Sequence, residues 1–202
     1  MNNRSGRWSA RNITTIALFT AVIVVVSQLS VPLPGGVPMT LQTFIIPLAG
    51  VVLGAFGGTM STILYVLLGA IGIPVFAGFT GGLGIVLGMT GGFIVSFPLM
   101  ALTAGWGDSL GRKVSGKGAS GKVLYYVILV VMLVIGSTLN YVVGTIWFMV
   151  AADATFATAF SACVAPFIPT AILKVVLVAI LGPVIRAALI KAHVLVPAGA
   201  AA

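Results

Sequence analysis

Glycine and phenylalanine gather without any charged residue in one segment of this chain, residues 69–92. The segment reads GAIGIPVFAGFTGGLGIVLGMTGG and holds nine glycines. Flexible linkers avoid bulky apolar residues, and a proline with two glycine pairs argues against one unbroken helix. We therefore expect a pocket for a small, partly apolar solute, walled by Phe76 and Phe79. Gly81 and Gly91 would bring bare backbone against that solute, unless the segment is only a structural re-entrant turn.

One lysine, Lys174, lies inside an otherwise apolar stretch, five residues after Pro169. A lysine at the centre of a membrane costs about 2.5–3.5 kcal/mol on insertion scales, and less near an interface. Its amine either reaches the headgroup region or meets an anionic ligand. Because no Asp or Glu lies within an expected span to pair with it, and the glycine-rich segment opens on the same face, we favour the ligand.

Polar residues recur along one face of the stretch 123–149. Ser137, Asn140 and Tyr141, with Gly144, follow a helical spacing of i, i+3, i+4 and i+7. Such a stripe must face the interior of a helix bundle rather than lipid. Its role is either a hydrogen bond between helices or recognition of a carbonyl, amide or ureido group. We favour recognition for Asn140 and Tyr141.

Gln42 is a further polar candidate, because it lies near the start of an apolar stretch, at the same expected face. Catalytic sites are not expected. Two loop sequences, GRKVSGK from Gly111 and GKGASGK from Gly116, lack the final Ser or Thr of a phosphate-binding loop. With two acidic residues, one histidine and one cysteine, no metal cluster or nucleophile–base pair can be assembled. The sequence predicts neither an enzyme nor a bound cofactor or metal.

The elements that must position these residues are membrane helices. Hydrophobic residues make up 60% of the chain, charged residues only 6%, and the mean hydropathy is +1.25. Each span needs about 20 apolar residues, so 202 residues accommodate six spans in a single integral-membrane domain, residues 1–202. The first stretch lacks a cleavage site and is expected to be a retained helix. The apolar stretches are 13–31, 40–57, 59–75, 85–105, 123–149 and 168–190.

Charge gives the expected topology. The net charge is +8, but nine of the ten cations fall in three clusters, at residues 4–11, 112–122 and 186–191. This pattern is typical of cytoplasmic segments rather than of nucleic-acid binding. Dividing 40–75 into two spans at GAFGG, residues 54–58, places all three clusters on one side. We expect an all-α membrane protein with six transmembrane helices, both termini cytoplasmic, and a glycine-rich non-helical outer loop between helices 3 and 4.

Motifs over nearly the whole chain resemble the BioY family, the biotin-binding S components of energy-coupling factor (ECF) transporters. The most specific are VPMTLQTF at 37–44, GAIGIPVFAGFTGG at 69–82, TGGF at 90–93, YVVGTIW at 141–147 and PFIPTAILK at 166–174. The resemblance implies a substrate-capture subunit in a prokaryotic plasma membrane that binds biotin at its outer face. It also implies docking through Ala17 and Ala21 of the first helix onto a transmembrane partner subunit carried by two ATPases.

The resulting site hypothesis combines the residues and the resemblance. The expected substrate-binding residues are Gln42, Phe76, Phe79, Gly81, Gly91, Asn140, Tyr141 and Lys174. The resemblance implies an acidic residue at about the position of Ala171, so an S component for a different small vitamin-like acid is one alternative. A stand-alone facilitator or channel is the other, although it would need a continuous polar path.

Overall fold

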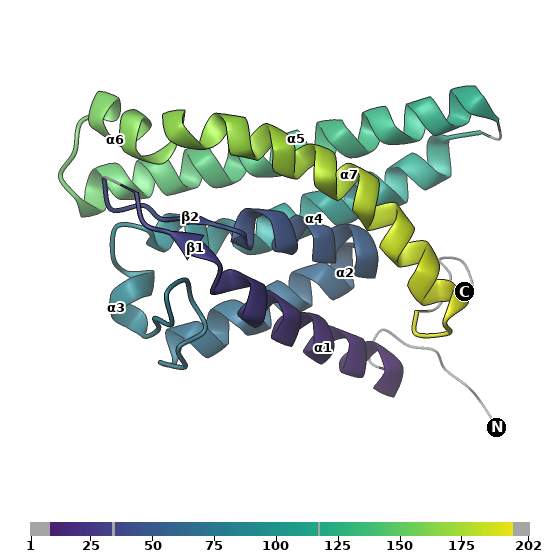
Figure 1. The fold of residues 1–202 in the computed structure, drawn as a ribbon, viewed down its shortest axis with the longest axis horizontal. Coiled ribbons are helices and arrows are strands. Elements are labelled where there is room, and N and C mark those ends of the chain that lie inside the picture. The colour runs from purple at the N-terminus through teal and green to yellow at the C-terminus, as the bar shows by residue number, and fades with distance from the viewer. Residues whose placement is uncertain (1–8, 34, 117, 196–202) are drawn as a thin grey trace.

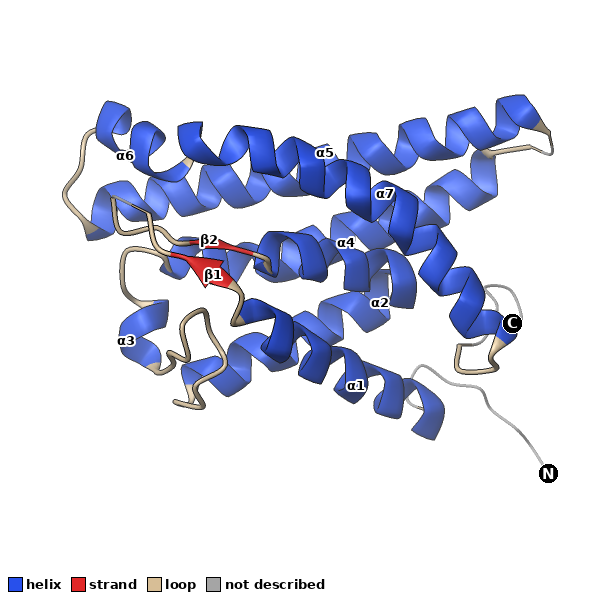
Figure 2. Cartoon of the chain, in the orientation of Figure 1, coloured by secondary structure: helices blue, strands red, loops and turns tan. Residues whose placement is uncertain are grey.

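The computed structural model describes residues 9–33, 35–116 and 118–195 and shows a bundle of long helices (Figures 1 and 2). The elements are α1 (Ala10–Ser27), β1 (Ser30–Val31), β2 (Met39–Thr40), α2 (Gln42–Ala70), α3 (Leu83–Val86), α4 (Gly91–Val114), α5 (Ala119–Ala151), α6 (Phe156–Cys163), the 3-10 turn η1 (Ala165–Phe167) and α7 (Ile168–Lys191). Of the expected cation clusters, Arg4, Arg7 and Lys117 lie outside the described residues.

Five helical stretches of the described chain are long and apolar enough to cross a membrane. They are α1, α2, α4, α5 and the continuous stretch from α6 through α7. The protein therefore has an all-α membrane fold with five or six long apolar helices, depending on whether α2 is counted once or as two halves.

Helix α2 turns back on itself at Gly54. Its backbone there has φ 80° and ψ 171°, a conformation that glycine adopts without strain. In a straight helix, Gln42 and Tyr65 would lie about 34 Å apart at roughly 1.5 Å per residue, yet the Gln42 amide nitrogen donates to the Tyr65 hydroxyl. Figure 1 shows the two halves of α2 running in opposite directions. The reversal falls within the expected interruption at 54–58.

Helix α4 is the centre of the bundle. In its most apolar window 61% of residues are buried, against 17% to 33% in the other four stretches. Glycines let α2 and α4 approach closely, because a Cβ on Gly50 would overlap the backbone of Ala101 and one on Gly105 would overlap that of Ala55. Many apolar side chains of α1, α5 and α7 face outward instead, as expected for surfaces that contact lipid.

A buried charge network closes the end of the bundle where α2 reverses, here called the Asp108 end. Asp108 is 1% exposed and accepts hydrogen bonds from Arg112 Nε and Nη2 and from the Tyr125 hydroxyl. Arg186 Nε lies 3.6 Å from the same carboxylate. Arg186 Nη1 also donates to the Val52 carbonyl at 2.7 Å, which satisfies a carbonyl at the end of the first half of α2. The network joins α2, α4, α5 and α7.

The opposite end, here called the hairpin end, carries the short antiparallel pair β1–β2, with Ser30 opposite Thr40 and Val31 opposite Met39. The loop between α2 and α4 also lies there. It was expected to be non-helical, but α3 forms one short helix within it. Helix α4 begins at Gly91 rather than near residue 85. Between the expected apolar stretches 123–149 and 168–190, where no span was expected, lies α6, whose start is capped by the Thr155 hydroxyl accepting from the Thr158 amide.

The network predicts a large stability effect for Asp108. Asp108→Asn removes the counter-charge of Arg186 and Arg112, and breaking such a buried pair costs about 3–5 kcal/mol. We expect a clearly lower melting temperature in detergent. The chain's other acidic residue provides the control, because Asp153 is exposed and asparagine tolerates its positive φ of 47°. Asp153→Asn should melt like the wild type, and equal melting of both variants would contradict a stabilising role for the network.

Candidate binding cavity

A cavity of about 240 Å³ opens at the hairpin end, close to the lower limit of the roughly 300–1,000 Å³ usual for small-molecule sites. Its walls come from the β1–β2 loop, the start of α2, the turn before α3, the start of α4, the middle of α5 and the first turns of α7. The lining residues are Gly36, Val37, Pro38, Thr40, Gln42, Thr43, Phe76, Ala77, Thr80, Ile85, Thr90, Phe93, Ile94, Phe97, Asn140, Tyr141, Cys163, Phe167 and Lys174.

Lys174 supplies the cavity's positive charge. Its ammonium donates to the Thr40 carbonyl at 2.7 Å and to the Thr43 hydroxyl at 2.9 Å. Both acceptors are neutral, and both ion pairs found among the described residues belong to Asp108 at the other end. Since an ammonium has three donors, one N–H is left for a ligand beyond these two bonds. Lys174 therefore has a free N–H and a positive charge with which to bind an anionic ligand.

Asn140 combines the two roles that the sequence left open. It is 1% exposed, and its amide nitrogen donates to the Phe93 carbonyl at 2.9 Å and to the Ser96 hydroxyl at 2.8 Å. These bonds tie α5 to α4, which is the structural role. Both amide hydrogens are thereby used, so toward the cavity Asn140 can only accept, through its side-chain oxygen. Tyr141, the next residue, also lines the cavity.

Gln42 and Phe76 both line the cavity, and both contact Tyr65. The Gln42 amide donates to the Tyr65 hydroxyl, and the Phe76 ring packs edge-on against the Tyr65 ring at 5.6 Å between centroids. Phe76 is 1% exposed. It fits because residue 69 is glycine, where a Cβ would overlap its ring. The cavity wall thus depends on a close approach between a glycine and an aromatic ring.

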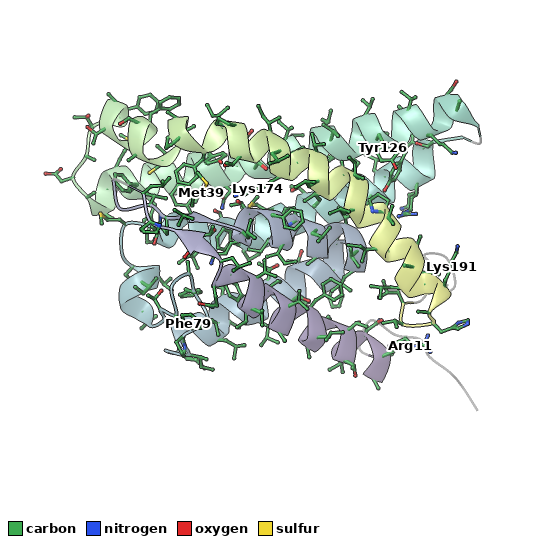
Figure 3. All side chains as sticks on the ribbon, viewed as in Figure 1. Arg11, Met39, Phe79, Tyr126, Lys174 and Lys191 are labelled. Carbon is green, nitrogen blue, oxygen red and sulfur yellow. The ribbon has the colours of Figure 1, made fainter. Side chains whose placement is uncertain are left out.

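Three expected site residues lie outside the cavity. Phe79 is 72% exposed and projects from the surface away from Lys174 (Figure 3), so it does not wall the pocket. Gly81 and Gly91 are instead needed for packing: a Cβ at Gly81 would overlap the Ile73 carbonyl, and one at Gly91 would overlap the Val86 carbonyl. These two glycines therefore have the structural role that the sequence analysis gave as the alternative to contact with a solute.

Other lining residues were missed from sequence. Phe93 and Phe97 face the cavity from α4, one helical turn apart, and Phe93 packs where α5 has Gly144. The i, i+4 spacing of these rings directly after Gly91 and Gly92 was the available signal. Cys163, the last residue of α6, and Phe167, the last residue of η1, lie outside all the apolar stretches expected from the sequence. Thr40, on β2, belongs to a strand pair too short to detect by alternation.

Comparison with known proteins shows the family of this chain. The sequence profile described as the BioY family matches residues 1–191. The chain belongs to the BioY family. The resemblance seen in the sequence motifs is therefore confirmed, and so is the expectation that the chain is not an enzyme, because BioY proteins are transporter components.

Two relatives and one solved structure show the extent of the match. "Probable biotin transporter BioY" of Pyrococcus horikoshii is 44% identical over 165 residues, covering 82% of this chain and 90% of the relative. "Biotin transporter BioY" of Rhodobacter capsulatus is 37% identical over 180 residues, with 82% and 88% covered. The crystal structure of the S component for biotin from an ECF-type ABC transporter superposes with a TM-score of 0.76 at 26% identity, covering 92% of this chain and 94% of that one.

The contact between residue 69 and Phe76 gives a test of the cavity wall. Gly69→Ala would force the Phe76 ring to move, and such overpacking costs about 1–3 kcal/mol. We expect a melting temperature several degrees lower in detergent. Gly84→Ala is the matched control, because a Cβ there meets open space. The described packing would be contradicted if the alanine at position 69 were as well tolerated as the alanine at position 84.

Proposed function

We propose that this chain captures biotin as the S component of an ECF-type transporter. The observation that carries the proposal is the Lys174 ammonium, which has neutral hydrogen-bond partners and no ion-pair partner among the described residues, in an otherwise largely apolar cavity. Biotin has a matching division, with a carboxylate at one end, an aliphatic chain, and a fused bicyclic ring with two ureido N–H groups. The family membership and the printed names of its relatives support the same ligand.

At one end of the ligand, the carboxylate would bind Lys174. Charge-assisted hydrogen bonds between ammonium and carboxylate are roughly twice as strong as neutral ones. The chain has only two acidic residues, and neither competes: Asp108 is engaged at the far end, and Asp153 is exposed in the turn after α5. Ala171, one turn before Lys174, adds no carboxylate that would neutralise the amine.

At the other end, the ureido group needs acceptors for its N–H groups. The Asn140 side-chain oxygen is one, since the amide hydrogens are already used within the protein. Gln42 and Tyr141 add polar atoms to the same cavity, and Phe76 supplies an apolar wall. Asn140 thus offers an acceptor in a chain that has Ala171 where the resemblance implies an acidic residue. Phe79, Gly81 and Gly91 are not part of this proposed contact set.

The proposed orientation places the Asp108 end in the cytoplasm and the hairpin end outside. Figure 3 shows Arg11 and Lys191 together at the end of the bundle opposite Phe79. Arg112 and Lys113 follow at the last turn of α4. Cations concentrate in cytoplasmic segments, so this end faces the inside of a prokaryotic plasma membrane. With α2 counted as two spans, six helices cross the membrane and both termini are cytoplasmic.

Helix α1 is the proposed docking face for the transmembrane partner subunit, which is carried by two ATPases. Its inward face is fastened to α2, where the Thr20 hydroxyl donates to the Ser61 carbonyl and the Ser61 hydroxyl donates to the Ile16 carbonyl, each at 3.1 Å. Ala17 and Ala21 lie on the exposed face of the same helix. Small residues four apart let a partner helix approach closely.

Removing the charge of Lys174 tests the proposed ligand. Lys174→Met keeps the length of the side chain but loses the ammonium. We expect biotin binding to weaken by about tenfold to a hundredfold, the range for a hydrogen bond to a charged group. Biotinamide, which has no carboxylate, should bind the variant and the wild type within a few-fold of each other. Isothermal titration of both ligands in detergent measures the difference.

The control is Lys191→Met, which removes an exposed cation at the Asp108 end. It should leave both affinities unchanged. An equal loss of acid and amide affinity in Lys174→Met would remove the carboxylate contact. An absence of biotin binding to the wild-type chain would contradict the proposed ligand itself.

A further inference from the structure

Gln28 connects the end of α1 to the cavity wall. Its amide nitrogen donates to the Val75 carbonyl at 3.0 Å, and its amide oxygen accepts from the Phe79 backbone N–H at 2.8 Å. The same nitrogen also donates to the Val24 carbonyl one turn back in α1, at 3.0 Å. One side chain therefore holds both ends of a turn that lies 47 to 51 residues further along the chain.

The turn at residues 76–80 forms part of the cavity. The Phe76 N–H donates to the Thr80 carbonyl at 2.9 Å, and the return bond from the Thr80 N–H measures 3.4 Å. Phe76, Ala77 and Thr80 all line the cavity. A displacement of this turn would therefore open the cavity wall.

Gln28 ties the Phe79 side of the turn to α1. Gly78 has φ 70° and Phe79 has φ 57°, a backbone region that residues other than glycine adopt at a cost. The Phe79 side chain is 72% exposed and contributes little packing. Its backbone N–H, however, is bonded to Gln28. Within the turn, the backbone bonds between Phe76 and Thr80 and the bond from the Thr80 hydroxyl to the Ala77 carbonyl, at 3.0 Å, hold the same conformation, so Gln28 is the link from the Phe79 side of the turn to α1.

We propose that Gln28 is a positioning residue that fastens the 76–80 turn to α1 and thereby controls access to the cavity. The inference rests on the proposed function, in which this cavity receives biotin and α1 carries the partner-facing residues Ala17 and Ala21. A tilt of α1 against the rest of the bundle pulls on the Val75 carbonyl and the Phe79 N–H through one side chain. Through Gln28, a movement of α1 on docking would therefore also move the cavity wall.

The single cysteine allows a test without any ligand. Cys163 lines the cavity, is 1% exposed, and is the only thiol in the chain. Its rate of modification by a small methanethiosulfonate reagent reports how often the cavity opens. Gln28→Met keeps the side-chain length but removes both bonds to the turn. We expect modification to be about tenfold faster, a factor within reach of two ordinary hydrogen bonds.

Thr14→Val is the matched control on the same helix. Its hydroxyl donates only within α1, to the Ala10 carbonyl at 2.9 Å, and lies far from the turn. The rate in this variant should equal that of the wild type. An unchanged rate in Gln28→Met, or an equal increase in both variants, would overturn the proposal. Circular dichroism and size-exclusion chromatography establish that each variant is folded.

The wild-type protein gives a second, independent readout. Hydrogen exchange at the Phe79 amide should be slow, because its N–H is bonded to Gln28 although the side chain is exposed. Exchange at the rate of a free amide would overturn the proposal even if Gln28→Met did not fold. Protection of wild-type Cys163 by excess biotin tests the proposed function separately, since the effect of Gln28→Met on labelling needs no ligand.

Discussion

The ammonium of Lys174 is the interaction on which the account of the site depends. It lies in the cavity, bonded to the Thr40 carbonyl and the Thr43 hydroxyl, and it forms no ion pair with a carboxylate among the described residues. A half-buried charge with neutral partners retains an unmet attraction for an anion. The surrounding rings and the Asn140 oxygen then determine which acid is suitable: one with an apolar middle and N–H groups at its far end. In the proposed function, the charge of Lys174 supplies affinity and the shape of the cavity supplies selectivity.

The two ends of the bundle are stabilised by different interactions. At the Asp108 end, one buried carboxylate with Arg112, Arg186 and Tyr125 joins α4, α5 and α7, and the bond from Arg186 to the Val52 carbonyl adds α2. At the hairpin end, short strands, irregular backbone and the Gln28 amide enclose the cavity. Neutral hydrogen bonds to a loop break more readily than a buried ion network. This difference supports the proposal that the hairpin end opens while the Asp108 end keeps the helices in place.

Several features of the structure follow from sequence patterns. Apolar length predicted the membrane helices. The distribution of cations predicted that the stretch 40–75 divides in two, and the glycines at 54–58 gave the place where α2 reverses. Unpaired charge and helical spacing predicted Lys174 and the stripe containing Asn140, and both reach the cavity. The glycine-rich segment was harder: which of its rings faces inward depends on Gly69 and Tyr65, which lie on another element. The Asp108 network was not anticipated, because its members are 78 residues apart and only tertiary structure joins them.

A structure of the wild-type protein with biotin bound would test the central claim most directly. The account predicts the biotin carboxylate within hydrogen-bonding distance of Lys174 Nζ, with the ring system beside Phe76 and an N–H group directed at the Asn140 oxygen. Biotin bound in the reverse orientation, with its carboxylate in solvent and Lys174 still bonded only to Thr40 and Thr43, would contradict it.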